Sequence, residues 1–229
     1  MMADSRRAIA SGEAALITAV GPTGVAANVN EDSPDYELNE EEKKFCAAYY
    51  SACKQFRSDA VAATRMMEMT HTGQDGQVDN TKANAFKHSL WTALMTTSAG
   101  GTTLGQTFSL AHEDHQYDLS RNTRRRRMSR MDIINNRVGY WVGKNAFGTD
   151  EKAARISACR TLVSRMRTGK KIGGKLDPFD EYKRLGFGSS SFEKSPTEVI
   201  STLIWRRSRA KTGMKVKQYS KPARRCEGI

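Results

Sequence analysis

Apolar residues recur at three- and four-residue intervals along most of this 229-residue chain, which is the spacing of amphipathic helices. The first stripe follows Asn39, a residue that can cap a helix, and three glutamates come next, where the helix dipole favours negative charge. Because this stripe continues to Met67, it predicts a single helix of about seven turns. The same spacing predicts four more helices, over residues 79–97, 103–117, 129–143 and 150–167.

Alternation with a period of two is scarce, so we expect an all-α protein, a compact bundle of about five to six helices. The last helix is predicted to begin at Ser195, where a capping box is combined with proline at the first helical position. These patterns divide the chain into four parts. They are a flexible N-terminal leader (1–35), a helical core domain that carries the candidate site (36–168), a C-terminal helical extension (169–210) and a basic C-terminal tail (211–229).

Two of the predicted helices carry unusual residues on one side. The helix over residues 79–97 has His88 and Trp91 on a stripe beside its broad apolar side, so we expect it to be buried nearly all round. In the fourth predicted helix, Gly139 and Gly143 share a stripe. Glycines in this arrangement allow another backbone, or a ligand, to come close.

The net charge of +12 is distributed unevenly along the chain. Residues 1–120 hold nine Lys and Arg against sixteen Asp and Glu, whereas residues 121–229 hold 28 against nine. This asymmetry predicts a polyanionic partner for the second half, which is nucleic acid, anionic lipid or an acidic protein; the alternative is that the basic half folds over the acidic half. No apolar run approaches the roughly 20 residues needed to span a membrane, and the N-terminus is not a convincing signal peptide. We therefore expect a soluble protein, and the sequence does not indicate its cellular compartment.

A dense run of arginines extends from Arg121 to Arg130. Like charges repel one another within a helix, so we expect a loop or mobile linker here, with the fourth helix beginning at Ser129. The run could contact several phosphates, although no helix-turn-helix, RRM or KH signature accompanies it.

The four cysteines, at positions 46, 53, 159 and 226, include no Cys-x-x-Cys pair, which argues against a zinc ribbon. Cys46 and Cys53 are two turns apart in the first predicted helix, too far for an easy disulfide within one helix. We therefore expect reduced, buried thiols.

Residues able to carry chemistry concentrate between Asn84 and Asn136, a stretch that holds three of the four histidines. Histidine supplies a base or a metal ligand, carboxylates suit acid–base work, and asparagine amides can stabilise an oxyanion, a mixture typical of hydrolysis or group transfer. A divalent metal ion is also compatible with these residues. A mononuclear zinc site needs three protein ligands, which His88, His112 and Asp132 would supply. The alternative is that these groups pair with one another and fix helix packing. The predicted catalytic residues are His88, His112, Glu113, Asp132, Asn135 and Asn136, and the predicted substrate-binding residues are Asn84, Trp91, Arg124, Arg125, Arg126 and Arg127.

His112 and Glu113 are adjacent, and therefore about 100° apart around the helix predicted over residues 103–117. We expect them not to point at one atom unless the helix ends or bends there. No His-Glu-x-x-His metal-binding pattern is present, because no histidine follows His112 four residues later.

Three blocks occur in order: Asn-Ala-Phe-Lys-His-Ser-Leu-Trp at 84–91, His-Glu at 112–113, and Met-Asp-Ile-Ile-Asn-Asn at 131–136. This pattern resembles a poorly characterised bacterial domain found at the C-terminal ends of polymorphic or secreted toxin-like proteins. The resemblance covers about residues 79–145 and implies a toxin-like enzyme domain with the catalytic residues named above. Lys87 and Tyr140 stand where that domain has arginine.

The leading hypothesis is a toxin-like or effector-type helical domain with hydrolase chemistry on an anionic substrate, which is RNA, DNA or phospholipid. In this hypothesis His88 or His112 is the base or a metal ligand, and the amides of the third block orient the substrate. The alternative is a non-catalytic basic protein that binds nucleic acid through its arginine run and basic tail, with a structural His/Asn cluster.

Overall fold

The structure is a computed structural model that describes residues 38–71, 81–98, 101–114, 123–146, 148–173, 177–184, 202–206 and 225–229. The chain separates into two compact units at residue 37, and all described residues belong to the second unit. The predicted leader at 1–35 and the predicted helix start at Ser195 lie outside the described residues.

The described residues form an all-α fold, as predicted, with one very small sheet. β1 (Lys170–Lys171) and β2 (Ile204–Trp205) pair in parallel. A short 3-10 helix, η2 (Cys226–Gly228), lies near the end of the chain. The α-helices are α2 (Glu40–Ala48), α3 (Tyr50–His71), α4 (Lys82–Thr97), α5 (Gly101–Asp114), α6 (Thr123–Lys144), α7 (Glu151–Thr168) and α8 (Pro178–Arg184).

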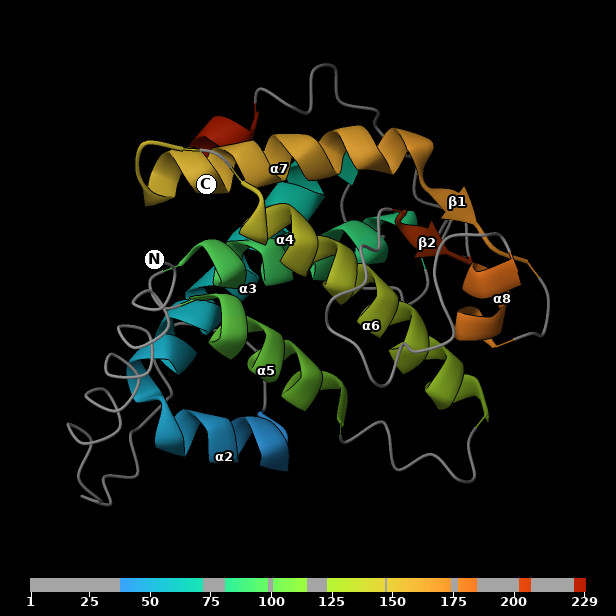
Figure 1. The fold of residues 1–229 in the computed structure, drawn as a ribbon, viewed down its shortest axis with the longest axis horizontal. Coiled ribbons are helices and arrows are strands. Elements are labelled where there is room, and N and C mark those ends of the chain that lie inside the picture. The colour runs from blue at the N-terminus through green and yellow to red at the C-terminus, as the bar shows by residue number, and fades with distance from the viewer. Residues whose placement is uncertain are drawn as a thin grey trace, which may run out of the picture. The chain divides into compact units, whose positions relative to one another are not determined.

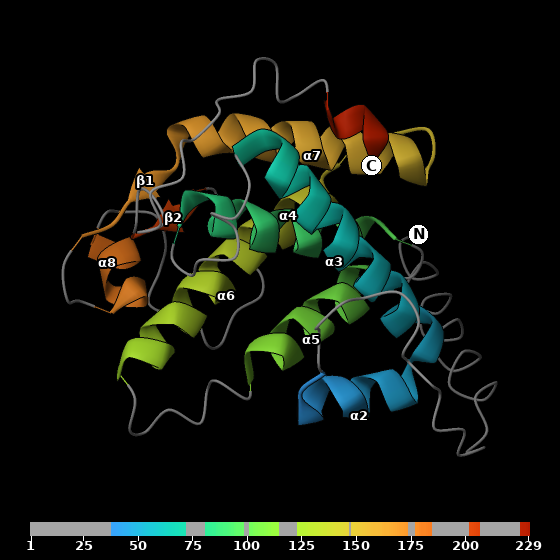
Figure 2. The same cartoon turned by 180° about the vertical axis from the view of Figure 1, so that it is seen from behind.

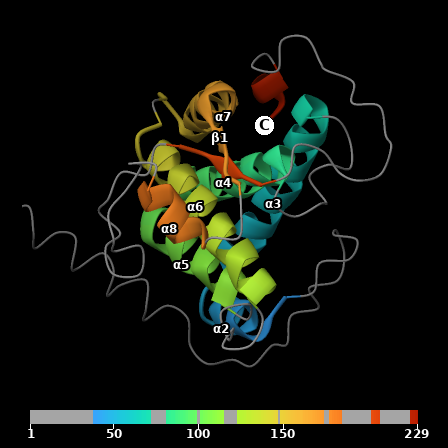
Figure 3. The same ribbon diagram turned by 90° about the vertical axis from the view of Figure 1, so that its right-hand side faces the viewer.

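The central element is α4, which contacts α3, α5, α6 and α7 (Figure 1). Seen from the side, α4 lies between α6 and α3, with α7 above it (Figure 3). Its residues 83–96 are all buried except Lys87, so the prediction of a helix buried nearly all round is confirmed. The buried hydroxyls of Ser89 and Thr96 donate to main-chain carbonyls of α4 one turn earlier, Ala85 at 2.8 Å and Thr92 at 2.7 Å, and need no solvent.

The glycine stripe of α6 is what lets it pack against α4. A β-carbon on Gly139 would lie 2.1 Å from the carbonyl oxygen of Ser89, and one on Gly143 would lie 2.6 Å from that of Ala93. Only a residue without a side chain fits at this separation. The predicted close approach is therefore to a backbone, the main chain of α4.

The prediction that the arginine run is a loop is wrong for residues 123–130, because they belong to α6. Buried residues from Met131 onward fix the helix against α4, and tertiary packing of this kind overrides local repulsion. Charge compensation also comes from outside the helix. Arg130 donates to Asp177 at 2.7 Å and lies over the ring of Phe179, 4.8 Å from its centroid.

The first predicted helix is two helices, so the prediction of one continuous helix is wrong. α2 ends at Ala48 and α3 begins at Tyr50, while Tyr49 between them has φ −133° and ψ 58°. This break brings the Cα atoms of Cys46 and Cys53 to 5.1 Å, and the two residues form a disulfide. In a continuous helix the same atoms would be about 10 Å apart, beyond the reach of a disulfide.

A second disulfide joins Cys159 in α7 to Cys226 in η2, 67 residues later. No cysteine is free, so the prediction of reduced thiols is wrong for all four. Within the predicted basic tail, residues 225–229 are packed on the helical core, because Cys226 is fully buried there.

The region after α7 also differs from the helical extension that was predicted. At the start of α8 the Asp177 carboxylate accepts from the main-chain N–H of Phe179 at 3.0 Å. Residues 204–205 are a strand and not the helix expected there. No helix in the described part of the chain is long and apolar enough to cross a membrane.

Candidate active site

His88 lies between two carboxylates that come from two other helices. Its Nδ1 is 3.6 Å from Glu113 Oε1, and its Nε2 is 3.8 Å from Asp132 Oδ1. α4 carries His88, the last turn of α5 carries Glu113, and the first half of α6 carries Asp132. The packing of α5 and α6 on the central helix therefore brings three of the predicted residues together.

His112 belongs to the same group. Its ring centroid is 6.0 Å from that of His88, and the ligand atoms of His88, His112 and Glu113 all lie within 4.8 Å of one another. The expectation that His112 and Glu113 would not share a target carried one exception, that the helix ends there. The structure describes α5 as far as Asp114, and in this last described turn both residues place a ligand atom in the same group.

Asn136 orients Glu113. Its side-chain NH₂ donates to Glu113 Oε1 at 3.3 Å, and its carbonyl oxygen accepts from the Thr92 hydroxyl at 3.1 Å. Because Thr92 is one turn after His88 on α4, the same helix that places the imidazole also fixes the amide.

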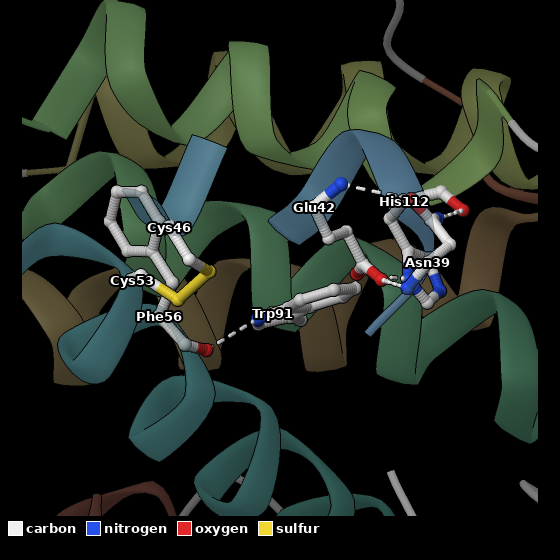
Figure 4. Close-up of a disulfide and its surroundings, with 7 residues drawn as sticks. All are labelled: Asn39, Glu42, Cys46, Cys53, Phe56, Trp91 and His112. Carbon is white, nitrogen blue, oxygen red and sulfur yellow. Dashed lines mark hydrogen bonds and ion pairs between the residues drawn. A yellow bond between two sulfur atoms is a disulfide. The ribbon is translucent and has the colours of Figure 1, made fainter. Parts of the chain in front are cut away.

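Glu42 is the residue of this site that the sequence did not reveal. It is buried at 1% exposure, and its Oε1 lies 2.8 Å from His112 Nδ1 (Figure 4). Asn39 holds both partners: its main-chain N–H donates to Glu42 Oε2 at 2.8 Å, and its side-chain NH₂ donates to the carbonyls of Ala111 and His112 at 2.9 and 3.1 Å. A capping box between Asn39 and Glu42 could have been read from the sequence, but the partner 70 residues away could not.

The surroundings shift the acidity of the two most buried groups in opposite directions. Burial and the nearby charge of Lys87 lower the pKa of His88 well below its usual value. Burial and the charge of Asp132 raise the pKa of Glu113 well above its usual value, against the hydrogen bond from Asn136. The His88 imidazole is therefore neutral near pH 7 and has a lone pair available to a proton or a metal ion.

The site approaches the surface on one side. The side chains of Glu113 and His88 are 2% and 8% exposed, whereas those of Asp132 and His112 are 11% and 21% exposed. Solvent therefore meets the group at His112 and Asp132, whereas the two inner side chains are shielded from water.

Two predicted residues lie close by but are engaged with main chain. The Asn135 amide donates to Ile204 O at 3.0 Å and accepts from Ile204 N at 3.1 Å, so it completes the edge of β2 that β1 leaves open. The Trp91 indole N–H donates to Phe56 O at 2.8 Å (Figure 4). Its ring meets that of His112 edge-on at 4.8 Å, so Trp91 supports the imidazole and is not an exposed platform.

The remaining predicted substrate-binding residues lie at the ends of helices. Asn84 is buried in the first turn of α4, one turn before His88, and Thr81 caps its main-chain N–H at 3.1 Å. Arg124–Arg127 occupy the first turn of α6, and the side chains of residues 124–126 lie outside the described part.

The fold and the site define an all-α domain with a buried His/carboxylate group at the meeting point of its helices. A family model described as a domain of unknown function, DUF6973, matches residues 44–169, more than half of the chain, and the chain belongs to this family. The matched range contains α4, α5 and α6, with every predicted catalytic residue, but begins just after Glu42. No curated protein and no solved structure matches the chain.

Proposed function

We propose that this chain is a toxin-like or effector-type hydrolase that cleaves a phosphodiester in RNA, DNA or phospholipid. The observation that carries the proposal is the position of the His88 imidazole, 3.6 Å from Glu113 and 3.8 Å from Asp132, beside a partly exposed His112. Imidazole and carboxylate groups gathered at a shielded site that still meets solvent are typical of acid–base catalysis.

Asp132 is the general base in this proposal, because it is the more exposed of the two carboxylates beside His88. Water forms the new bond to phosphorus, and the bond from phosphorus to the leaving oxygen breaks. The proton of the water goes to Asp132, and the leaving oxygen takes a proton from solvent. Asn136 and Glu113 form a fixed polar wall behind the reacting groups.

Charge and cysteine pairing support the kind of substrate and the toxin-like character. The excess of lysine and arginine over residues 121–229 favours a polyanion over a neutral substrate. Both disulfides suit a protein that works in an oxidising environment, as exported effectors do.

The experiment compares cleavage of labelled RNA, single- and double-stranded DNA, and phosphatidylglycerol vesicles by the full chain and two variants. Asp132→Asn should lower kcat by about 10²–10⁴-fold while the melting temperature holds, since asparagine has the same shape. The control is Asp180→Asn, an exposed aspartate on α8, which should cleave at the parent rate.

The proposal is wrong if none of these substrates is cleaved faster by the parent than by Asp132→Asn. A salt series tests the anionic character separately, because KM for a polyanion should rise steeply with ionic strength. A KM that does not respond to salt would exclude attraction by the basic half.

A further inference from the structure

We propose that His88, His112 and Glu113 bind one divalent transition-metal cation, for which Zn²⁺ is the best match. The site rests on geometry alone, whereas its catalytic use rests on the proposed function. The three ligand atoms lie within 4.8 Å of one another and combine two imidazoles with one carboxylate. This donor set leaves an open position in the tetrahedral zinc sites of hydrolases.

The first argument concerns the inner nitrogen of His88. Nδ1 is buried and makes no hydrogen bond to any described residue, although Glu113 Oε1 faces it at 3.6 Å. A buried polar atom without a partner costs free energy. A cation between the two atoms satisfies both. The other ring nitrogen, Nε2, faces Asp132, as in histidines that ligate a metal with a carboxylate behind them.

His112 has the same arrangement. Its Nδ1 is 2.8 Å from the buried Glu42 carboxylate, and an Nδ1–H that donates there leaves the ring lone pair on Nε2. Glu42 is itself held by the main-chain N–H of Asn39. Carboxylates that fix the tautomer and the ring orientation of a histidine are the usual outer partners of metal ligands.

Glu113 is oriented in the same way, through the Asn136 amide on its Oε1. Each of the three ligands therefore has a polar group that sets its direction from behind. Bond lengths of about 2.0–2.1 Å place the ligand atoms of a tetrahedral zinc ion about 3.3 Å apart. The separations of up to 4.8 Å are larger, and small side-chain rotations bring the atoms onto a bound ion.

The donor set also selects the kind of cation. Ca²⁺ and Mg²⁺ prefer shells of oxygen ligands, whereas two imidazole nitrogens with one carboxylate favour zinc and its neighbours in the transition series. All four cysteines are in disulfides and supply no thiolate that would compete for the ion.

The test measures Zn²⁺ binding to the chelator-stripped full chain by titration calorimetry and by metal analysis after gel filtration. We expect one Zn²⁺ per chain and a melting temperature that rises with Zn²⁺ but not with Mg²⁺ or Ca²⁺. Glu113→Gln and His88→Ala should each weaken binding by at least about tenfold. Glu181→Gln, at a buried carboxylate of α8 that is bonded to Arg206 and to none of the three ligands, should bind Zn²⁺ as the parent does.

Zinc content below one-half per chain at tenfold excess, equal binding by Glu113→Gln, or an equal response to Ca²⁺ would each overturn the site. The melting curve of metal-free Glu113→Gln shows that the fold is retained, because glutamine keeps the size of glutamate. A chain that binds Zn²⁺ and cleaves nothing leaves the cation site standing and removes the proposed function. Cleavage by a chain that takes up no Zn²⁺ leaves the proposed function standing and removes the cation site.

Discussion

Glu42 and His112 are separated by 70 residues and joined by a partly buried hydrogen bond of 2.8 Å. α2, which carries Glu42, is a short helix that lies beside α5 (Figure 2). Its position is fixed by the Asn39 cap at one end and by the Cys46–Cys53 disulfide at the other. The orientation of His112 therefore depends on how firmly α2 is held.

Glu42→Gln should weaken Zn²⁺ binding by about 10–100-fold, because the amide no longer fixes the His112 tautomer and ring. The matched control is Glu41→Gln, in the same turn of α2, where the carboxylate pairs with Lys44 and its side chain is 41% exposed. Calorimetric titration of both variants measures the difference. Equal affinities for Zn²⁺ would show that Glu42 does not position His112.

The two disulfides should have separable effects. Replacing Cys46 and Cys53 with alanine frees α2, so it should lower the free energy of unfolding by about 2–3 kcal/mol and also weaken Zn²⁺ binding. Replacing Cys159 and Cys226 opens a much longer loop and should cost about 4 kcal/mol, with unchanged zinc affinity, because that bridge ties α7 to η2. Urea unfolding and calorimetry measure the two quantities. Equal loss of zinc affinity in both double variants would contradict the role given to α2.

Gly139→Ala should lower the free energy of unfolding by about 1–3 kcal/mol or more. Its new methyl group would lie 2.1 Å from the Ser89 carbonyl oxygen and push α6 away from α4. The control is Gly173→Ala, where nothing lies within 4 Å of the added carbon, and its effect should stay within about 0.5 kcal/mol. Urea denaturation compares the two. A small effect at Gly139 would mean that the two helices separate at little cost.

Arg155→Met tests the buried pair that joins α7 to α3. Burial raises the pKa of Asp59, and Arg155, 2.7 Å away, opposes this rise. The variant should lose about 3–5 kcal/mol of stability near pH 7, since an uncompensated carboxylate remains buried. A pKa that is higher in the folded than in the unfolded state means that stability falls as pH rises above the ordinary aspartate value. The deficit should therefore shrink as pH is lowered toward about 4.

The control for this prediction is Arg160→Met, which removes an ion pair with Glu227 whose two side chains are 51% and 62% exposed. Its loss should stay below about 1 kcal/mol at every pH, because solvent screens exposed pairs. Urea unfolding at several pH values follows both variants. A deficit in Arg155→Met that is independent of pH would show that Asp59 is not the group responsible.

Much of the candidate site could be predicted because its residues lie on strongly patterned helices. His88 stands in a helix with apolar residues on nearly every side, and the glycines of α6 indicated where another backbone would approach. The helical pattern could not show which side chains from different helices come close together. Glu42 looked like one of three dipole-favoured glutamates, and only the docking of α2 on α5 distinguishes it from Glu40 and Glu41.

The corrected predictions share one cause, which is that local rules were outweighed by tertiary contacts. Repulsion among arginines predicted a loop, but the contact of Arg130 with Asp177 and the buried face of α6 keep the segment helical. Helical spacing predicted separate thiols, but one non-helical residue, Tyr49, turns the chain and brings Cys46 to Cys53.

By itself, the sequence determined the class of the fold, the approximate helices and the stretch that holds the histidines, because helix periodicity and composition are local properties. The tertiary structure alone decided which polar groups meet, that Asn135 serves β2, and that Glu42 reaches His112. Contacts between residues tens of positions apart depend on how whole helices pack against one another. A local sequence pattern does not encode that packing.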